Sequence, residues 1–567
     1  MDNIDKKRHS LSHLLAMAVL EKFPRAKLAI GPVIENGFYY DFDGVKFSDD
    51  DLPTLEKRMR ELIAKDLKFQ KKNIVKAETK KLFKEQPYKL ELIKELKNIS
   101  IYKSGDFTDL CAGPHVKSTK EINPDAFKLE KTAGAYWRGS EKNPMLTRIY
   151  GLAFETKKEL SDYLKFQEEA EKRDHRKLGP QLDLFMFHET APGMPYWLPK
   201  GLVAINELID FWRKEHAKYG YQEIKSPLIN KKELYETSGH WDHYRDNMFI
   251  SQTEEKETYA LKPMNCPNAM VVFASKKHSY RELPLRLSDT DTLHRYERSG
   301  TLSGLLRVRE FSQDDAHIFI SEDQIKDEYS KILEIAEKFY SIFNINYSFR
   351  LGTRPEKFMG DVKNWNRAEK ELKEILEKSK KPYSILKGDG AFYGPKIDIL
   401  MKDSLGREWQ TGTIQLDFQI PKRFKLSYIN KDGKEKTPIV IHRVIYGSLE
   451  RFVGILIEHY AGAFPTWFSP VQAKILPVSE KFNDYAKKVL EELKEAEIRA
   501  EIDESNETLG KKIRSAELQK IPYILVVGEK EKQSGTVAVR ERGKGDLGAI
   551  KLENFIEKIK KQILEKN

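Results

Sequence analysis

A charged segment without glycine or proline divides this chain, and it limits the possible folds more than any other feature. Residues 155–178 are almost all good helix formers, and Gly179 and Pro180 follow them directly. Strong helix formers predict a helix, heavy charge predicts that it is exposed, and the Gly-Pro pair predicts where it ends. We therefore expect one exposed helix that joins separate domains. The chain has 567 residues, which leaves room for about three or four domains.

The composition excludes several classes of protein. Hydrophobic residues make up 40% and aromatic residues 11% of the chain, which is enough for ordinary cores and excludes global disorder. The two cysteines, Cys111 and Cys266, form no CxxC pair and cannot provide a secreted disulfide framework. No segment approaches the ~20 apolar residues of a membrane helix, so we expect a cytoplasmic protein. The 99 Lys and Arg residues exceed the 88 Asp and Glu residues by 11, which suits a polyanion partner.

The hydrophobic patterns predict four regions and an α+β fold with several domains. We place the four regions at residues 1–153, 154–180, 181–468 and 469–567. The first region mixes helices and strands, with strand and turn signals between residues 29 and 42. Its first apolar residues have the spacing of one helix face and are Leu11, Leu14, Leu15, Ala18 and Val19.

The third and fourth regions have different patterns. The third begins with an amphipathic segment at 202–219, and residues 221–227 then form a strand pattern that runs into a proline. Many short strand patterns follow, which predicts an antiparallel sheet with inserted helices. The fourth region alternates strands and helices, at 473–477, 485–496, 499–502, 509–518 and 523–527. This βαβαβ order predicts a small doubly wound domain.

Three histidines and one cysteine of the first region form a candidate site. His9 and His13 stand four residues apart on the predicted helix and therefore share a face. Cys111 and His115 flank Ala-Gly-Pro, a turn sequence that can point both side chains into one space. Such a set could bind zinc, or it could supply acid, base and positioning groups for a hydrolysis. The alternative is that all four are ordinary buried or surface residues.

The other cysteine and two further histidines could form a second metal site. Cys266 belongs to the string KPMNCP, His317 to DDAH and His442 to IHR. Their separation is too large for a short metal motif, and spacing alone does not join them. A cysteine and two histidines with a fourth position open would suit a catalytic zinc rather than a structural one.

Arginines with an acidic and an aromatic neighbour form another candidate site in the third region. Arg295 and Glu297 lie in RYE, and Arg307 and Phe311 lie in RVREF beyond a loop with two glycines. On paired strands they could hold a phosphate, an adenine amino group and the face of its ring. Arg451 starts an apolar helix pattern. The P-loop and GxGxxG sequences are absent, which excludes the commonest nucleotide sites. Surface ion pairs remain the alternative.

Basic residues also gather near the end of the chain. We expect them in loops of the fourth region, and they are Lys530, Lys532, Arg540, Arg542 and Lys544. Such a cluster could contact RNA, although a solvated charged face is the more common outcome.

Taken together, these segments resemble the threonyl-tRNA synthetase family of class II aminoacyl-tRNA synthetases, from residue 9 to about residue 553. Residues 202–227 resemble class II motif 1 at the dimer interface, residues 293–311 resemble motif 2, and residues 446–451 resemble motif 3. The strings KPMNCP, QDDAHIF, DGAFYGPKID and IHR are close to the family's own. TAGAYWRG and the HxxxH and CxxxH pairs resemble its editing domain.

The resemblance implies roles for individual residues. Catalytic roles fall to Arg295, Arg451 and His240, of which His240 would help the terminal ribose hydroxyl to attack. ATP contacts fall to Arg295, Glu297, Arg307, Phe311, Lys396, Gln410 and Arg451. Threonine contacts fall to Gln313, Asp315, Tyr393 and Gln415. The implied zinc ligands, for one zinc per subunit, are Cys266, His317 and His442, and Mg²⁺ would accompany ATP. The implied editing residues are His9, His13, Cys111 and His115, and the implied anticodon contacts are Asn506, Glu531 and Arg540.

The family's fold and activity follow as expectations. We expect an editing domain in 1–153, a linker helix in 154–180, a class II catalytic domain on an antiparallel sheet in 181–468, and an α/β anticodon-binding domain in 469–567. The activity would form threonyl-adenylate from L-threonine and ATP, transfer threonine to the 3′ end of tRNA(Thr), and hydrolyse mischarged seryl-tRNA(Thr). We expect a homodimer without membrane contact. Many bacterial members begin with a small ubiquitin-like domain, whereas this sequence starts directly at the editing region, so either that domain is absent naturally or the sequence is trimmed.

Two other interpretations stay open. The first is another class II ligase with a similar C-terminal domain, such as the prolyl type, and Cys266, His317 and His442 disfavour it. The second is an RNA-binding regulator that kept the fold and lost catalysis. The presence of Arg295 and Arg451 disfavours that one.

Overall fold

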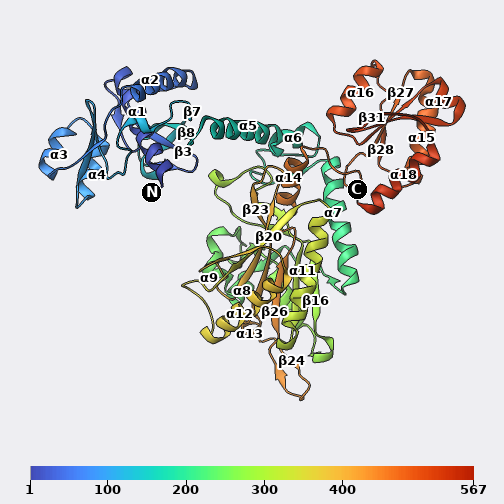
Figure 1. Ribbon diagram of the computed structural model, residues 1–567. Coiled ribbons are helices and arrows are strands. Elements are labelled where there is room, and N and C mark those ends of the chain that lie inside the picture. The colour runs from blue at the N-terminus through green and yellow to red at the C-terminus, as the bar shows by residue number, and fades with distance from the viewer. Residues whose placement is uncertain (1, 567) are drawn as a thin grey trace. The chain divides into compact units, whose positions relative to one another are not determined.

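The structure is a computed structural model that describes residues 2–566. The chain forms two compact units, Met1–Glu169 and Ala170–Asn567, whose helices and strands are drawn in Figure 1. Helices and sheets occur in both units, which confirms the α+β prediction. Within the described part of the chain, no helix is long and apolar enough to cross a membrane.

A mainly antiparallel sheet and two helices form the larger part of the first unit. The strands pair in the order β1-β3-β8-β7, with β2 on β3. Their bounds are Lys27–Leu28 (β1), Val33–Ile34 (β2), Gly37–Asp43 (β3), Phe127–Tyr136 (β7) and Met145–Ala153 (β8). Helices α1 (Asn3–Lys22) and α2 (Leu52–Ala64) share a core with this sheet. The five apolar residues predicted to share a helix face are all buried in α1, which confirms their helical spacing.

A smaller sheet of the first unit leads into the segment from Cys111 to His115. It pairs β4 (Gln70–Asn73), β5 (Ser100–Ser104) and β6 (Phe107–Leu110) antiparallel, and α3 (Lys76–Leu82) and α4 (Pro87–Glu95) connect β4 to β5. After β6 the chain turns at Gly113, which has a φ of +75°. A Cβ at Gly113 would lie 2.3 Å from Tyr102 Oη. Only glycine therefore fits this turn.

The prediction of a single joining helix is wrong in two respects. The segment forms α5 (Lys157–Arg173) and α6 (His175–Gln181), with a break at Asp174. Asp174 has a ψ of 117°, and its carboxylate accepts the backbone N–H two residues further on, so it caps a new helix instead of continuing the first. Gly179 and Pro180 lie inside α6 and do not end it. A proline removes only one backbone donor, and the next turn still forms a hydrogen bond across it.

An eight-stranded sheet is the centre of the second unit (Figure 1). Its order is β11-β16-β19-β26-β23-β22-β20-β21, and only the outermost pairs, β11–β16 and β20–β21, are parallel. This confirms the predicted antiparallel sheet. The bounds are Gln222–Glu223 (β11), Leu285–Asp289 (β16), Asp315–Ile320 (β19), Ile439–Val444 (β26), Glu408–Asp417 (β23), Lys396–Lys402 (β22), Asn346–Gly352 (β20) and Tyr383–Leu386 (β21).

The strand predicted at 221–227 is much shorter in the structure. Only β11 pairs with the sheet as a strand, the N–H of Ile224 still donates to Ser288 of β16 at 2.8 Å, and the chain then turns away. The backbone N–H of Ser226 donates to Asp291 Oδ2 at 2.8 Å, and Pro227 has no donor to offer a neighbouring strand. The apolar pattern did not reveal that these groups bond outside the sheet.

Four helices cover one face of the sheet and leave its other face to a cavity. They are α7 (Pro199–Lys218), α11 (Ile325–Ser341), α12 (Val362–Ser379) and α14 (Leu449–Tyr460), and they share one core with alternate strand residues. On β19, Ile318 and Ile320 belong to this core, so His317 faces the opposite side. α10 (Cys266–Ala274) packs on that opposite side, against Phe319.

Short elements surround the sheet and the cavity. They are β9 (Phe185–Met186), β10 (Tyr196–Trp197), β12 (Ile229–Lys231), α8 (Lys232–Ser238), α9 (His240–Tyr244), β13 (Ile250–Gln252), β14 (Thr258–Leu261), β15 (His278–Ser279), β17 (Thr292–His294), β18 (Glu310–Ser312), α13 (Ile420–Arg423), β24 (Tyr428–Ile429) and β25 (Glu435–Lys436). β17 and β18 pair antiparallel. The loop between them, residues 295–309, is called the arginine loop below.

The C-terminal part of the second unit forms a separate five-stranded sheet, in the order β28-β27-β29-β30-β31. β27 (Ala473–Pro477), β28 (Ala500–Ile502) and β29 (Tyr523–Val527) are parallel and are connected by α15 (Asn483–Glu495) and α16 (Leu509–Leu518). The βαβαβ prediction is thus confirmed, with the predicted bounds for β27, α16 and β29. α17 (Glu529–Ser534), the antiparallel strands β30 (Thr536–Glu541) and β31 (Gly545–Lys551), and α18 (Leu552–Glu565) complete this part.

The prediction that all five residues of the basic cluster lie in loops is wrong for three of them. Lys530 and Lys532 belong to α17, and Arg540 belongs to β30. Arg542 and Lys544 do lie in a turn. The Arg542 guanidinium, however, donates to the carbonyls of two residues distant in sequence, so it holds the fold together instead of facing a partner.

Candidate functional site

Three potential metal ligands from distant parts of the chain meet on the uncovered face of the central sheet. Cys266 is the first residue of α10, His317 lies on β19, and His442 lies on β26. The two histidines are paired across their strands, so they share a face of the sheet. The Cys266 thiol and one nitrogen of each histidine lie within 4.8 Å of one another, and all three residues are buried.

The unsatisfied atoms of this cluster fit a metal ion. Among the described residues, neither nitrogen of His317 nor Nδ1 of His442 has a hydrogen-bond partner, although all three atoms are buried. Nε2 of His442 donates to Asp417 Oδ2 at 2.9 Å, and such a bond orients a ligating histidine. Burial lowers the pKa of His317 well below its usual value, which keeps it in the neutral form that binds metals. One sulfur and two nitrogens suit zinc with an open fourth position.

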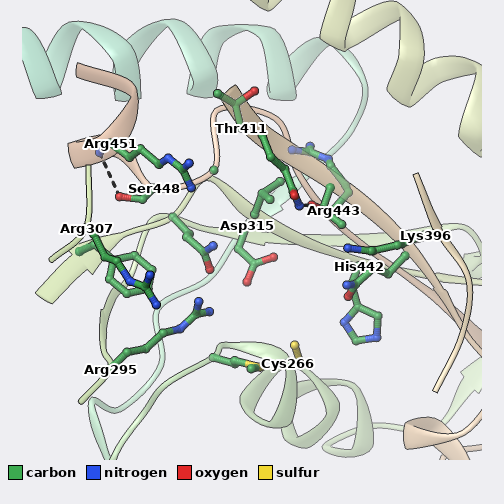
Figure 2. A pocket seen from close by; sticks show the side chains of 18 of the residues that line it. Cys266, Arg295, Arg307, Asp315, Lys396, Thr411, His442, Arg443, Ser448 and Arg451 are labelled. Carbon is green, nitrogen blue, oxygen red and sulfur yellow. Dashed lines mark hydrogen bonds between the residues drawn. The ribbon is translucent and has the colours of Figure 1, made fainter. Parts of the chain in front are cut away.

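Arginines lie across the same cavity from this cluster. Figure 2 shows Arg295, Arg307 and Arg451 on one side of the cavity, and His442 and Lys396 on the other. Arg295 and Arg307 belong to the arginine loop, and Arg451 lies in the first turn of α14. The cavity has a volume of about 620 Å³, which is in the range of sites for small ligands and cofactors.

The arginines on one side of the cavity are arranged so that they could bind an anion. The Arg295 guanidinium lies 5.0 Å from the centroid of the Phe311 ring, and Arg307 Nη2 lies 2.9 Å from Glu297 Oε2. Burial, together with the nearby charge of Arg307, lowers the pKa of Arg451. A bound anion would relieve this repulsion, and planar guanidinium groups suit phosphate oxygens.

The cavity contains most of the residues implied for the reaction. Those that line it are Cys266, Arg295, Glu297, Arg307, Phe311, Gln313, Asp315, Tyr393, Lys396, Gln410, Gln415, His442 and Arg451. Within this set, the Tyr393 hydroxyl donates to Gln415 Oε1, and burial raises the pKa of Asp315 to about 6. The structure therefore brings together residues from five strands, two helices and the loops between them that are far apart in sequence.

Lys396 and Gln410 are held by a carboxylate beneath the cavity. Lys396 Nζ lies 3.2 Å from Asp398 Oδ2, and Gln410 Nε2 donates to Asp398 Oδ1 at 2.9 Å. Gln410 Oε1 in turn accepts a hydrogen bond from Arg350 at 2.7 Å. These bonds fix where both side chains point, although neither Asp398 nor Arg350 was among the predicted residues.

His240 does not line the cavity directly. It is the first residue of α9 and is buried. Its Nδ1 lies 2.8 Å from Ser238 Oγ, and its Nε2 lies 3.1 Å from Met264 Sδ. Met264 does line the cavity. Burial, followed by the charges of His442 and Arg295, lowers the pKa of His240 to about 4, so the imidazole is neutral at pH 7.

Residues that the sequence analysis missed also line the cavity. Thr411 and Thr413 are two of them, and they lie on β23 at alternate positions before Gln415. Alternate residues of a strand share a face, so Thr413 and Gln415 were a signal that the motif search did not use. An irregularity in the pairing of β22 with β23 interrupts the alternation before Thr413, and the Thr411 hydroxyl bonds to Tyr340 of α11. Figure 2 shows Thr411 above Asp315.

The first unit brings its four predicted residues together. The ligand atoms of His9, His13, Cys111 and His115 lie within 4.8 Å of one another. Cys111 Sγ lies 3.4 Å from His9 Nε2 and 3.3 Å from His115 Nε2. Burial is the main cause that lowers the pKa of His9, His13 and His115, and burial raises the pKa of Cys111 to about 11. All four groups are therefore neutral at pH 7.

A buried ion pair lies behind this cluster. Asp109 Oδ2 is 3.8 Å from His13 Nε2, and Asp109 Oδ1 is 2.5 Å from Lys89 Nζ. The Tyr40 hydroxyl donates to Asp109 at 2.6 Å. The sequence analysis missed these residues, because β3, α4 and β6 bring them together across the fold.

The residues implied for anticodon contacts do not all lie at one end of their sheet. Asn506 follows β28 and Glu531 lies in α17 after β29, so both lie beyond the carboxyl ends of parallel strands. Arg540 is paired with Ile524, near the start of β29. Glu531 also accepts the backbone N–H of Gly528 at 3.0 Å, which gives it a structural role as a helix cap.

Three family models match separate parts of the chain. The tRNA synthetase class II core domain (G, H, P, S and T) matches residues 249–460. The anticodon binding domain matches residues 472–562. The threonyl and alanyl tRNA synthetase second additional domain matches residues 99–150. These matches cover both the cavity of the central sheet and the segment with Cys111 and His115.

Relatives and solved structures agree with these matches. The threonine–tRNA ligase of Caldanaerobacter subterraneus is 54% identical over 564 residues, which are 98% of this chain and 87% of the relative. That of Acetivibrio thermocellus is 53% identical over 99% of this chain and 89% of the relative. The crystal structure of the RNA binding domain of threonyl-tRNA synthetase from Cryptosporidium parvum is 43% identical, with a TM-score of 0.67 over 69% of this chain and 98% of that one. With about half of its residues identical to curated threonine–tRNA ligases over nearly its full length, the chain belongs to the threonine–tRNA ligase family.

Proposed function

We propose that this chain is a threonine–tRNA ligase that also removes wrongly attached serine. It would form threonyl-adenylate and pyrophosphate from L-threonine and ATP, and then transfer threonine to the 3′-terminal ribose of tRNA(Thr). The observation that carries the proposal is a single cavity with three arginines on one side and, on the other, Cys266 and His442, two members of a buried Cys-His-His set that His317 completes. An amino acid and a nucleotide are the two ligands that such a cavity can hold side by side.

Four segments would divide this work. Residues 1–153 would be the editing domain, 154–180 the linker, 181–468 the catalytic domain and 469–567 the anticodon-binding domain. The bond of His175, after the break at Asp174, to Glu458 supports a contact between the end of the proposed linker and the proposed catalytic domain.

Zinc on Cys266, His317 and His442 would provide the selection of threonine. Threonine and valine are nearly isosteric, and an apolar pocket rejects an added hydroxyl poorly. A site that binds the hydroxyl rejects the analogue without it by about 10⁴-fold or more. A zinc held by these three residues would offer the threonine hydroxyl such a site. Gln313, Asp315, Tyr393 and Gln415 would hold the rest of the amino acid.

The arginines would stabilise the first reaction step. Arg295, Arg307 and Arg451 can neutralise the charge that develops on the phosphates during attack by the carboxylate, with Mg²⁺ on ATP. Glu297 would accept a hydrogen bond from the adenine amino group, and Phe311 would stack on the adenine ring. Lys396 and Gln410, held by Asp398, would face the nucleotide. No general base is needed, because the attacking carboxylate carries no proton.

His240 would assist the second step, the attack of the ribose hydroxyl. Its lowered pKa keeps the imidazole neutral at pH 7, and only the neutral form can accept a proton. Met264 stands between His240 and the cavity. Rotation of this flexible side chain would open a path for the terminal nucleotide.

The cluster of the first unit would hydrolyse seryl-tRNA(Thr). Serine keeps the hydroxyl and lacks one methyl group, a difference worth only about 1–3 kcal/mol, so the synthetic site would accept it too often. Neutral His9, His13 and His115 beside Cys111 can position a water next to the aminoacyl ester. Either a metal, or imidazoles together with RNA hydroxyls, could hold that water, and we propose no metal there.

The proposed partners follow from the same assignments. Asn506, Glu531 and Arg540 would contact the anticodon of tRNA(Thr). A homodimer would form through α7 and the adjoining β11, where Leu202 is an apolar side chain with 48% of its surface exposed. The cytoplasm is the proposed compartment, which suits two free cysteines.

ATP–pyrophosphate exchange with a panel of amino acids tests this proposal. Exchange that depends on threonine and not on valine or proline would support it. Exchange with another amino acid would indicate a different ligase. Silence with every amino acid, in a chain that still binds tRNA, would favour an RNA-binding regulator.

A further inference from the structure

A buried histidine lies where the linker, the arginine loop and α14 meet. His175 is the first residue of α6, and only 1% of its surface is exposed. Its Nδ1 lies 2.6 Å from Glu458 Oε1 on α14. Its Nε2 accepts the backbone N–H of Leu305, in the arginine loop, at 3.0 Å. One imidazole thus joins two elements that contribute to the cavity.

These contacts define the form of the imidazole. Nε2 accepts a hydrogen bond from an N–H group, so it carries no proton. The proton is on Nδ1 and is donated to the carboxylate of Glu458, whose other oxygen accepts Arg407 Nη2 at 2.5 Å. Asp174, His175 and Glu458 lie close enough together to hold a metal ion. Both ring nitrogens of His175 already have protein partners, however, so we assign no metal to this group.

The bond to Leu305 fixes the tip of the arginine loop. Ser303 N–H donates to the carbonyl of Arg307 at 3.2 Å and closes a turn around Leu305. The Leu305 side chain is fully buried. Gly304 has a φ of +50°, and a Cβ there would lie 2.2 Å from His175 Nε2. The loop therefore approaches the imidazole as closely as a glycine permits, and Arg307 enters the cavity two residues after Leu305.

The same network reaches a second arginine of the cavity. Arg407 Nε donates to Asp403 Oδ2 at 2.7 Å, and the same oxygen accepts Trp409 Nε1 at 2.8 Å. The ring of Trp409 lies 5.9 Å from the guanidinium of Arg451. Bonded side chains thus extend from the arginine loop through Glu458 to the aromatic surface beside Arg451.

We propose that His175 is a positioning residue for the nucleotide: its Nε2 holds the backbone of Leu305 and so keeps Arg307 in place for the phosphates of ATP, whereas Glu458 only orients the imidazole. This inference rests on the proposed function, because it takes ATP as the ligand. His175 itself does not line the cavity and acts through the loop.

Two substitutions separate the two bonds of the imidazole. In His175→Asn the amide nitrogen replaces Nδ1 and keeps the bond to Glu458, whereas the acceptor for Leu305 is lost. In His175→Gln the longer side chain places its oxygen at Nε2 and keeps the bond to Leu305. His188→Asn is the matched control, because His188 is exposed and its Nδ1 hydrogen-bonds to Thr190, outside the network of His175.

The affinity for Mg·ATP, measured by titration calorimetry without threonine, is the first readout. An unsatisfied buried N–H group should weaken ATP binding by about tenfold in His175→Asn, while His175→Gln should stay within about threefold of the wild type. In pyrophosphate exchange, the KM for ATP should rise in His175→Asn while the KM for threonine stays unchanged. A merely structural role would change both KM values, or lower the melting temperature of both variants alike.

Equal ATP affinity in wild type and His175→Asn would overturn the inference, as would equal losses in the Asn and Gln variants. If His175→Asn does not fold, Gly304→Ala attacks the same bond from the loop side, and it should weaken ATP binding to a similar degree. Unchanged ATP affinity in Gly304→Ala would also overturn the inference. A wild-type chain that binds ATP but exchanges with no amino acid would refute the proposed function, and the calorimetric comparison would still decide the role of His175.

Discussion

Replacing Cys266 by alanine should remove the zinc that we propose for the catalytic cavity. The thiol is one of three ligand atoms that lie within 4.8 Å of one another. Structural zinc sites with four ligands are worth about 10–16 kcal/mol, or roughly 3 kcal/mol for each ligand. The loss of one ligand from three should therefore weaken zinc binding by about two powers of ten. A metal held by only two histidines would be lost during purification.

The same substitution should disturb the fold little. Cys266 begins α10 and is only 8% exposed, and alanine is a better helix former than cysteine. The loss of one buried sulfur atom should cost about 1 kcal/mol of the free energy of unfolding. Cys111→Ala is the matched control, because it makes the same change in the other unit and leaves the three proposed ligands intact.

Metal analysis after dialysis against a weak chelator provides the assay, followed by threonine-dependent pyrophosphate exchange. Wild type and Cys111→Ala should each retain one zinc per chain in the catalytic cavity, and Cys266→Ala should retain none and lose exchange. If Cys266→Ala keeps one zinc per chain with unchanged affinity, the thiol is not a ligand and only packs beside its neighbouring prolines.

Three further predictions test other parts of the proposal. Arg540→Ala should weaken tRNA binding and leave threonine-dependent exchange intact. If Arg540 contacts a phosphate, the salt dependence should also lose about one unit of slope, and an equal loss of exchange would contradict the separation of roles. The double substitution of His9 and His13 by alanine should leave threonylation nearly normal and slow the deacylation of pre-formed seryl-tRNA(Thr); equal hydrolysis by wild type would return both residues to a structural role. Light scattering at micromolar concentration should give about twice the chain mass of 66.0 kDa, and a mass near that of one chain would count against the dimer.

Local sequence patterns were sufficient to predict the bounds of some helices and strands and insufficient to predict others. The strand at Tyr523–Val527 and the helix at Leu509–Leu518 have their predicted bounds, because apolar runs and helical spacing are local signals. The joining helix was predicted wrongly because its break depends on distant partners. Asp174 caps α6, and His175 is buried against Glu458, 283 residues further along the chain. Nothing near residue 175 in the sequence indicates that contact.

The candidate sites show the same limit more sharply. His9 and His13 were predicted to share a face, because four residues on one helix fix that relation. Cys266, His317 and His442 were joined only by the family resemblance, since their meeting depends on the pairing of β19 with β26 and on the packing of α10. The support of Lys396 and Gln410 by Asp398 was not predicted at all, because the alternate polar positions along β22 and β23 become a site only when the sheet forms.

The chemistry of the two clusters explains why one chain needs both. The cavity of the second unit would face charged ligands, and its three arginines would hold the phosphates of ATP tightly. A water-activating site there would hydrolyse the adenylate that the arginines stabilise. The cluster of the first unit, in contrast, carries no net charge. Its histidines are neutral, and the buried Lys89 and Asp109 behind it neutralise each other. A neutral cluster suits an aminoacyl ester and offers little to a polyphosphate. Synthesis and hydrolysis would therefore need opposite electrostatic surroundings, and the two sites that we propose for them lie in separate compact units.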